Sequence, residues 1–220
     1  MILSYRNIND ISQDVTLADN DNIFAPVDIE SLLNRMFGIT IEYYTLHPAG
    51  LILGMCSNQP QVVKVKDGEN IIYAQLNDKV IFIDSSLKEI KAQGRRLFTI
   101  AHEGAHLYLF FMEGRKDALA HRYLRENSVS RNFDWDEWQA DTMASCLLMP
   151  EANVRYVFNL FFQCEHIDKI TPFRKDEYFI FNEIADFFGV SKTAMAIRLK
   201  KLNLIDSFDF SKSIDIRMEA

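Results

Sequence analysis

Residues 95–108 read RRLFTIAHEGAHLY, and they determine how the rest of the sequence is interpreted. Apolar positions recur beside two histidines at helical spacing, so we expect this stretch to form a helix. In such a helix His102 and His106 lie one turn apart on one face, where both imidazoles can bind one metal ion. Glu103 falls on the adjoining flank, where its carboxylate is better placed for a metal-bound water than for the metal. The HExxH pattern therefore predicts a Zn²⁺ site with a general base beside it; the alternative is a pair of histidines hydrogen-bonded within a core.

A third ligand is expected from another part of the chain, because a catalytic zinc usually has three protein ligands and an open position. Residues 134–141 read DWDEWQAD, and we predict Glu137 as that ligand. Asp141 lies one helical turn later, where it can hydrogen-bond a liganding histidine and fix its tautomer. The competing interpretation is local, because Asp134 followed by Glu137 three residues on is also a capping-box pattern.

Together, TIAHEGAH at 99–106, EWQAD at 137–141 and LLMP at 147–150 resemble the ImmA/IrrE family of bacterial metallopeptidases. The similarity runs from about Ile81 to Pro150, with a weaker echo over residues 184–205. It implies a gluzincin-like zinc peptidase core, with Glu103 as the base and with three metal ligands, His102, His106 and Glu137. It also implies a substrate, because characterised members are linked to cleavage of helix-turn-helix repressors.

Two positions depart from the family pattern. The family commonly has a bulky residue and then glycine between the histidines, where this chain has Gly104 and then Ala105. It often has asparagine where Asp141 stands. Both changes are mild, because a small residue still precedes the second histidine and an aspartate also accepts the proposed hydrogen bond.

Composition indicates a soluble globular protein. The 220 residues are 48% hydrophobic and 25% charged, with a net charge of -7, which argues against direct binding to nucleic acid or to an anionic membrane. The N-terminal residues lack the pattern of an export signal. The three cysteines are odd in number and widely spaced, which favours reduced thiols, and we expect a cytoplasmic protein.

We expect an α+β fold in which a small, mainly antiparallel sheet packs with a helical zinc-peptidase core and a helical pair follows. Five short β-like runs separated by turn-prone residues precede the HExxH helix, so consecutive strands are predicted to pair as hairpins. The segment after that helix, through residue 132, is predicted as a surface helix and loop. The predicted division is a loosely ordered N-terminal arm (1–26), a zinc-peptidase domain (27–165), a helical, helix-turn-helix-like segment packed on the core (166–206) and a tail (207–220).

The C-terminal segment has two interpretations. Residues 184–199 suggest two helices joined through Gly189, with Ser191 capping the second, as in a helix-turn-helix. One hypothesis is DNA contact through four basic side chains, Lys192, Arg198, Lys200 and Lys201. The other, which the acidic neighbours Glu177, Glu183 and Asp186 favour, is a helical pair packed on the peptidase core.

The predicted function is that of a zinc-dependent endopeptidase that cuts a cytoplasmic regulatory protein, such as a helix-turn-helix repressor, at a specific site. Two imidazoles and one carboxylate leave a bound Zn²⁺ with a net positive charge, which favours hydrolysis over a structural role. The alternative is a metal-containing regulator or adaptor, without peptidase activity, that binds DNA or protein through the C-terminal helical pair.

Overall fold

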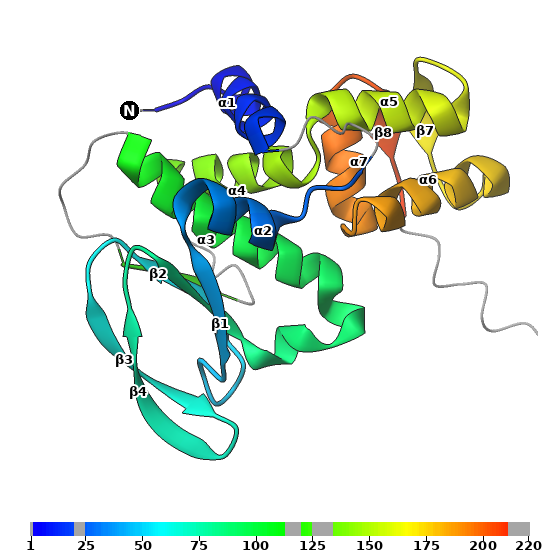
Figure 1. The fold of residues 1–220 in the computed structure, drawn as a ribbon. Helices are drawn as coiled ribbons and strands as arrows, with labels where there is room; N and C mark the ends of the chain where they lie inside the picture. Colours follow the sequence, from blue (N-terminus) through cyan, green and yellow to red (C-terminus); the bar gives the residue numbers. More distant parts are fainter. Residues whose placement is uncertain (1, 20–24, 113–119, 125–133, 211–220) are drawn as a thin grey trace, which may run out of the picture.

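A computed structural model describes residues 2–19, 25–112, 120–124 and 134–210. The predicted α+β class is confirmed, with helices gathered on one side of a small sheet (Figure 1). Two short 3₁₀ turns, η1 (Ser85–Lys88) and η2 (Ile90–Ala92), precede the longest described helix. The α-helices are α1 (Tyr5–Asp19), α2 (Ile29–Phe37), α3 (Gln93–Met112), α4 (Trp135–Leu148), α5 (Glu151–Phe162), α6 (Lys175–Phe187) and α7 (Lys192–Lys201).

The strands form one mixed sheet and two separate pairs. The main sheet has the order β1-β5-β2-β6, in which β1 is parallel to β5 while β2 is antiparallel to both β5 and β6. The other pairs are the antiparallel β3–β4 and the parallel β7–β8. The strands are β1 (Thr40–Tyr44), β2 (Ile52–Ser57), β3 (Gln61–Asp67), β4 (Asn70–Leu76), β5 (Val80–Asp84), β6 (Ala120–Leu124), β7 (Ile167–Ile170) and β8 (Ile205–Phe208).

The predicted series of consecutive hairpins is wrong except for β3–β4. There Asp67 pairs with Asn70 around a two-residue turn in which Gly68 has φ 57°, a backbone conformation that glycine adopts without strain. Elsewhere turn-prone residues locate the ends of strands but do not specify their partners, and β5 pairs with the distant β1. Residues 120–124 also differ from the prediction of a surface helix and loop, because pairing with β2 makes them a strand; the rest of that stretch lies outside the described residues.

Helix α3 is enclosed by the sheet and by other helices. One side contacts β2 and β5, and others contact α2 and α4 (Figure 1). Its buried apolar residues, among them Ile100, Ala101 and Ala105, join Leu53 and Ile81 of the sheet in one core cluster. The HExxH segment is therefore held between two packed layers, where its side chains have little freedom to move.

The N-terminal residues form a helix, so the prediction of a loosely ordered arm over 1–26 is wrong for Tyr5–Asp19. Helix α1 contacts α4 and buries Ile8, Ser12 and Val15. These positions recur at helical spacing, a weak amphipathic pattern that numerous polar residues obscure in the sequence. The Leu3 backbone N–H also donates to Gln139 Oε1 at 2.7 Å, which fixes the start of α1 against α4.

The C-terminal part contains the predicted pair of helices, α6 and α7. Gly189 has φ 63° at the turn between them, and the Ser191 hydroxyl accepts from the Ala194 backbone N–H at the start of α7. The parallel strands β7 and β8 flank the pair. Strand β8 runs two residues into the predicted tail at 207–220, and residues 211–220 of that tail lie outside the described residues.

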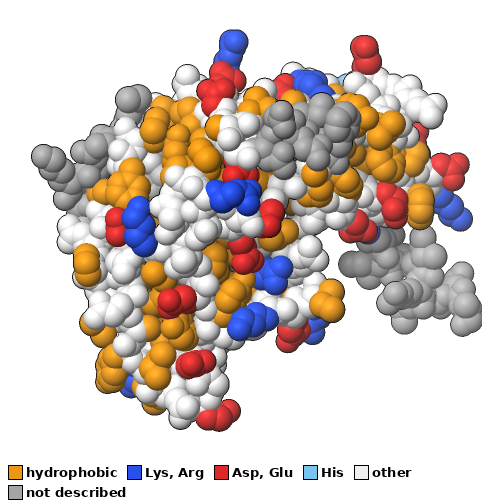
Figure 2. Space-filling view, in the orientation of Figure 1, with side chains coloured by type: hydrophobic (Ala, Val, Ile, Leu, Met, Phe, Trp, Pro, Cys, Tyr) orange, Lys and Arg blue, Asp and Glu red, His pale blue; other side chains and the backbone are white. Residues whose placement is uncertain are grey.

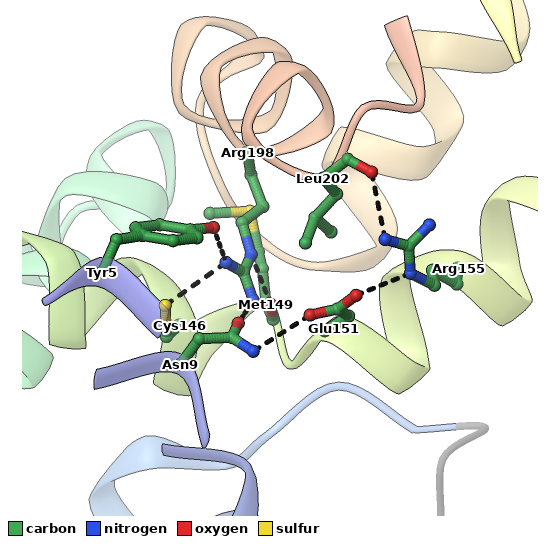
Figure 3. A network of polar contacts seen from close by, with 8 residues as sticks. All are labelled: Tyr5, Asn9, Cys146, Met149, Glu151, Arg155, Arg198 and Leu202. Atoms are coloured by element: carbon green, nitrogen blue, oxygen red, sulfur yellow. Dashed lines mark hydrogen bonds and ion pairs between the residues drawn. The ribbon is translucent and has the colours of Figure 1, made fainter. Parts of the chain in front are cut away.

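Arg198 is buried at the centre of a polar network, which contradicts the hypothesis that it contacts DNA (Figure 3). Its guanidinium donates to the Met149 carbonyl at 2.9 Å, to Asn9 Oδ1 at 2.8 Å, to Cys146 Sγ and to the Tyr5 hydroxyl. One side chain of α7 thereby joins α1 to α4 and to the start of α5. A buried cation needs such acceptors, because its desolvation is otherwise very costly.

The Glu151 carboxylate is linked to the Arg198 guanidinium through Asn9 and compensates its positive charge. Asn9 Nδ2 donates to Glu151 Oε2 at 2.9 Å, and Arg155 Nε donates to Glu151 Oε1 at 2.7 Å. Burial raises the pKa of Glu151, but the Arg155 and Asn9 hydrogen bonds and the nearby Arg198 charge outweigh that effect and lower the pKa overall. Arg155 also donates to the Leu202 carbonyl at 3.0 Å, so the network closes on the end of α7.

None of the described helices is long and apolar enough to cross a bilayer.

Arg198→Met should destabilise the protein by about 2 to 4 kcal/mol, because it leaves several buried acceptors without a donor. The measurement is urea unfolding followed by circular dichroism. Lys200→Met is the matched control, since Lys200 is exposed on the same helix and its loss should change stability by less than about 0.5 kcal/mol. Equal unfolding midpoints for the two variants would show that the network contributes nothing.

Candidate metal centre

His102 and His106 lie side by side on α3. Both are buried, with 0% and 5% of their surfaces exposed. Their rings meet edge to face with centroids 4.7 Å apart, and their Nε2 atoms lie 3.1 Å from each other. The single-turn spacing in the sequence therefore brings two ring nitrogens to one point, as predicted.

Glu137 approaches the same point from the first turn of α4. Its Oε2 lies 3.5 Å from His102 Nε2, and its Oε1 lies 3.4 Å from His106 Nε2. Asp134 caps α4 by accepting from the backbone N–H groups of Asp136 and Glu137. Capping thus uses the Glu137 backbone, while its carboxylate faces the histidines, so the local capping interpretation and the metal-ligand interpretation are compatible.

Asp141 lies one turn further along α4 and contacts the other side of His102. Its Oδ1 is 2.9 Å from His102 Nδ1. A hydrogen bond from Nδ1–H to this carboxylate leaves the Nε2 lone pair directed at Glu137 and His106. Burial lowers the pKa of His102, but its hydrogen bonds with Asp141 and Glu137 outweigh that effect and raise the pKa to about 9. A metal cation would replace the proton at Nε2 and meet the same carboxylates.

The donor set fits a tetrahedral metal ion. Ligand atoms about 2.0–2.1 Å from a tetrahedral Zn²⁺ are about 3.3–3.4 Å from one another. The two Nε2 atoms are 3.1 Å apart, and each lies 3.4 to 3.5 Å from a different oxygen of the Glu137 carboxylate, which is close to that value. These three residues form a cluster that could hold a metal ion. Two imidazoles and one carboxylate also leave a position for water, the arrangement of catalytic rather than structural zinc sites.

Glu103 lies against β2. It is fully buried, and a Cβ added at Gly54 would lie 2.8 Å from Glu103 Oε1 and 2.6 Å from Thr99 Cγ2. Only glycine at that position lets the strand approach this carboxylate so closely. Cys56 lies two residues along β2. Burial first, then the charge of Glu103 and a hydrogen bond with it, and then the Glu137 charge raise the pKa of the Cys56 thiol well above its usual value.

Gly104 allows a second close approach, from α2. A Cβ at this position would lie 2.8 Å from two methyl carbons of Leu33. Glycine within a helix costs about 1 kcal/mol relative to alanine, so a packing requirement of this kind accounts for its presence. The same contact gives a physical reason for the departure from the family pattern at this position.

Sequence reasoning missed Gly54 and Cys56. A lone glycine inside a β-like run is a signal for close backbone approach, so Gly54 could have been found, whereas nothing in the sequence distinguishes Cys56. Hydrolysis also needs a donor that stabilises the oxyanion, and the sequence offers five candidates: His121, Tyr123, Tyr156, His166 and Tyr178. Of these, His166 contacts Asp206 and Asn203, and Tyr178 packs on Phe181 and Phe210. Their partners are therefore in the C-terminal part, while the side chains of residues 121 and 123 lie outside the described ones.

A helix carrying HExxH and a glutamate on the next described helix are the pattern typical of metal-dependent peptidases. Residues 62–200 match the family model of the M78 peptidases, described as the IrrE N-terminal-like domain. That match covers more than half of the chain, and the chain belongs to this metallopeptidase family, as the sequence motifs predicted. The comparison with curated proteins gives no match.

Metal binding should depend on each of the three clustered residues. His102→Ala, His106→Ala or Glu137→Ala should each remove most bound Zn²⁺, and Asp141→Ala should weaken affinity about 10- to 100-fold, because an unsupported histidine is a poorer ligand. Zinc content after dialysis and calorimetric titration measure both effects. Asp136→Ala is the matched control, as a carboxylate in the same turn of α4 outside the cluster. Full occupancy in Glu137→Ala would exclude Glu137 as a ligand.

Proposed function

We propose that this protein is a zinc-dependent endopeptidase that cuts a cytoplasmic regulatory protein, such as a helix-turn-helix repressor, at one site. The observation that carries the proposal is the convergence of His102, His106 and the partly exposed Glu137 on one point, with the buried Glu103 next in sequence to His102. Membership of the M78 peptidases supports hydrolysis of a protein substrate. Zinc is the metal that two histidines and one carboxylate most often hold in hydrolases.

Each residue has a separate task in this proposal. Bound at the cluster, Zn²⁺ supplies Lewis acidity toward the scissile carbonyl and makes its water more acidic. Glu103 is the base that accepts the proton of the attacking water and then delivers it to the leaving amine. Asp141 holds the His102 ring, the Cys56 thiol interacts with the Glu103 carboxylate, and the missing side chain at Gly54 leaves room for that carboxylate.

Strand β6 offers the backbone edge along which an extended substrate can lie. Among the described strands it pairs only with β2, and its residues 121 and 123 stand opposite Cys56 and Gly54. The free side of an edge strand can add a peptide through main-chain hydrogen bonds. This edge therefore runs beside the strand that contacts Glu103, which favours a flexible or locally opened segment as substrate over a folded helix.

The structure gives less support to a regulator that binds DNA through the C-terminal helices. Arg198 is buried, Lys192 lies over the Tyr178 ring and Lys201 over the Tyr5 ring. On the face shown in Figure 2, acidic and basic side chains are interspersed rather than gathered into one basic surface. The overall charge of -7 also opposes attraction to phosphate.

Glu103→Gln should retain zinc and lose peptidase activity by a factor of about 10² to 10⁴ or more, because it removes the base but no ligand. Zinc content and the rate of substrate cleavage are measured on the same preparation. Glu151→Gln is the control for loss of a partly buried carboxylate outside the site. A wild-type rate in the zinc-loaded Glu103→Gln protein would disprove this mechanism.

The substrate prediction is one cut in a DNA-binding repressor and little digestion of casein. The test is to co-express the protein with the transcriptional repressor encoded beside it, and to follow the repressor's length by immunoblotting. The Glu103→Gln variant should leave the repressor intact. A repressor that stays intact under every inducing condition, together with ready digestion of casein, would indicate a general peptidase instead.

A further inference from the structure

A groove of about 1010 Å³ lies between the start of α3 and the turn that joins α6 to α7. One wall comes from η1, η2 and the first turns of α3, and the other from residues 186–194. The helix-turn-helix-like element therefore contributes its turn to a concave surface of the peptidase core. None of the groove's lining residues is a proposed metal ligand.

The lining of the groove reaches along α3 as far as Phe98, one helical turn before His102. Arg95 and Phe98 line it, and they precede His102 by seven and four residues, which places all three on the same side of the helix. The Phe98 and His102 ring centroids are 6.2 Å apart. At about 1.5 Å per helical residue, Arg95 lies about 10 Å from His102 along the axis, a span that about three residues of an extended peptide cover.

The two walls are packed tightly where they meet. A Cβ added at Gly94 would lie 3.2 Å from the Gly189 carbonyl oxygen and 3.3 Å from the Ser191 nitrogen. The turn between α6 and α7 thus rests directly on the first turn of α3. The two walls are thus packed against each other at the base of the groove, so a peptide bound there would lie at a defined distance from the metal centre.

Charge is distributed unevenly inside the groove. Glu89 and Lys91 neutralise each other through an ion pair of 2.9 Å. Arg95 on one wall and Asp186 on the other are exposed, and neither forms an ion pair within the described part of the chain. Two unpaired charges of opposite sign on opposite walls are suited to an extended peptide that carries complementary charges.

We propose that this groove holds the substrate chain a few residues from the bond that is cut, with Arg95 binding an acidic side chain and Asp186 a basic one. The inference rests on the proposed peptidase function and adds to it a rule for sequence preference. It also gives α6 and α7 a role in choosing the peptide segment rather than in reading DNA.

The test is to digest a pool of short synthetic peptides of randomised sequence with the zinc-loaded protein and to identify the cut sites by mass spectrometry. Wild type should favour an acidic residue about three positions from the cut. Arg95→Glu should change the acidic-to-basic ratio there by about fivefold or more, since exposed ion pairs have effects of that order. Asp186→Lys should change the preference at a different position, and added salt should weaken both preferences.

Arg6→Glu is the matched control, because it makes the same charge change at an exposed position of α1 outside the groove. A second readout is the binding of the best-cut peptide, labelled with fluorescein, to Glu103→Gln and to Glu103→Gln/Arg95→Glu, where the double variant should bind more weakly. Cleavage with unchanged preferences in both charge-reversal variants would overturn the groove proposal and leave the peptidase function standing. A pool left uncut by zinc-loaded wild type would overturn this inference, while the co-expression test with the repressor decides the peptidase function separately.

Discussion

The arrangement of the whole site depends on how closely α3 approaches its neighbours. Three glycines set these distances: Gly54 admits the Glu103 carboxylate to the backbone of β2, Gly104 admits Leu33 of α2, and Gly94 admits the turn before α7. The contacts at Gly54 and Gly104 are too short for a β-carbon, and a β-carbon at Gly94 would require its neighbour to move by a few tenths of an ångström. Glu103 and both histidines are thereby held by close packing, which would reduce the reorganisation needed for the proposed metal binding.

The HExxH segment and its partner on α4 could be predicted from the sequence because their chemistry is encoded in short-range spacing. His102 with His106, and Glu137 with Asp141, each form a one-turn repeat that specifies a shared helical face. The strand partners could not be predicted in the same way. A turn-prone segment such as Asn77-Asp78 ends a strand, but which strand lies beside it depends on burial of both faces of the sheet.

Two further differences between prediction and structure have one physical origin. The amphipathic pattern of α1 is diluted by polar residues, and Arg198 has a residue type that is usually exposed. The packing of α1 and the burial of Arg198 explain each other, because Tyr5 and Asn9 of α1 provide acceptors for the guanidinium. Two segments that lie far apart in the sequence and bury each other show no pattern within either segment. The apolar spacing of a single amphipathic helix, by contrast, can be read from its own sequence.

The network around Arg198 joins α1, near the start of the sequence, to α7. Starting the protein at the domain boundary predicted at residue 27 would delete Tyr5 and Asn9 together and leave a cation enclosed among α4, α5 and α7 with fewer acceptors. Such a shortened protein would have to admit water to that interior or rearrange α7. Helix α7 follows the turn that rests on Gly94 at the start of α3. Helix α1, remote in sequence from every proposed ligand, thus belongs to the scaffold that determines where α3 begins.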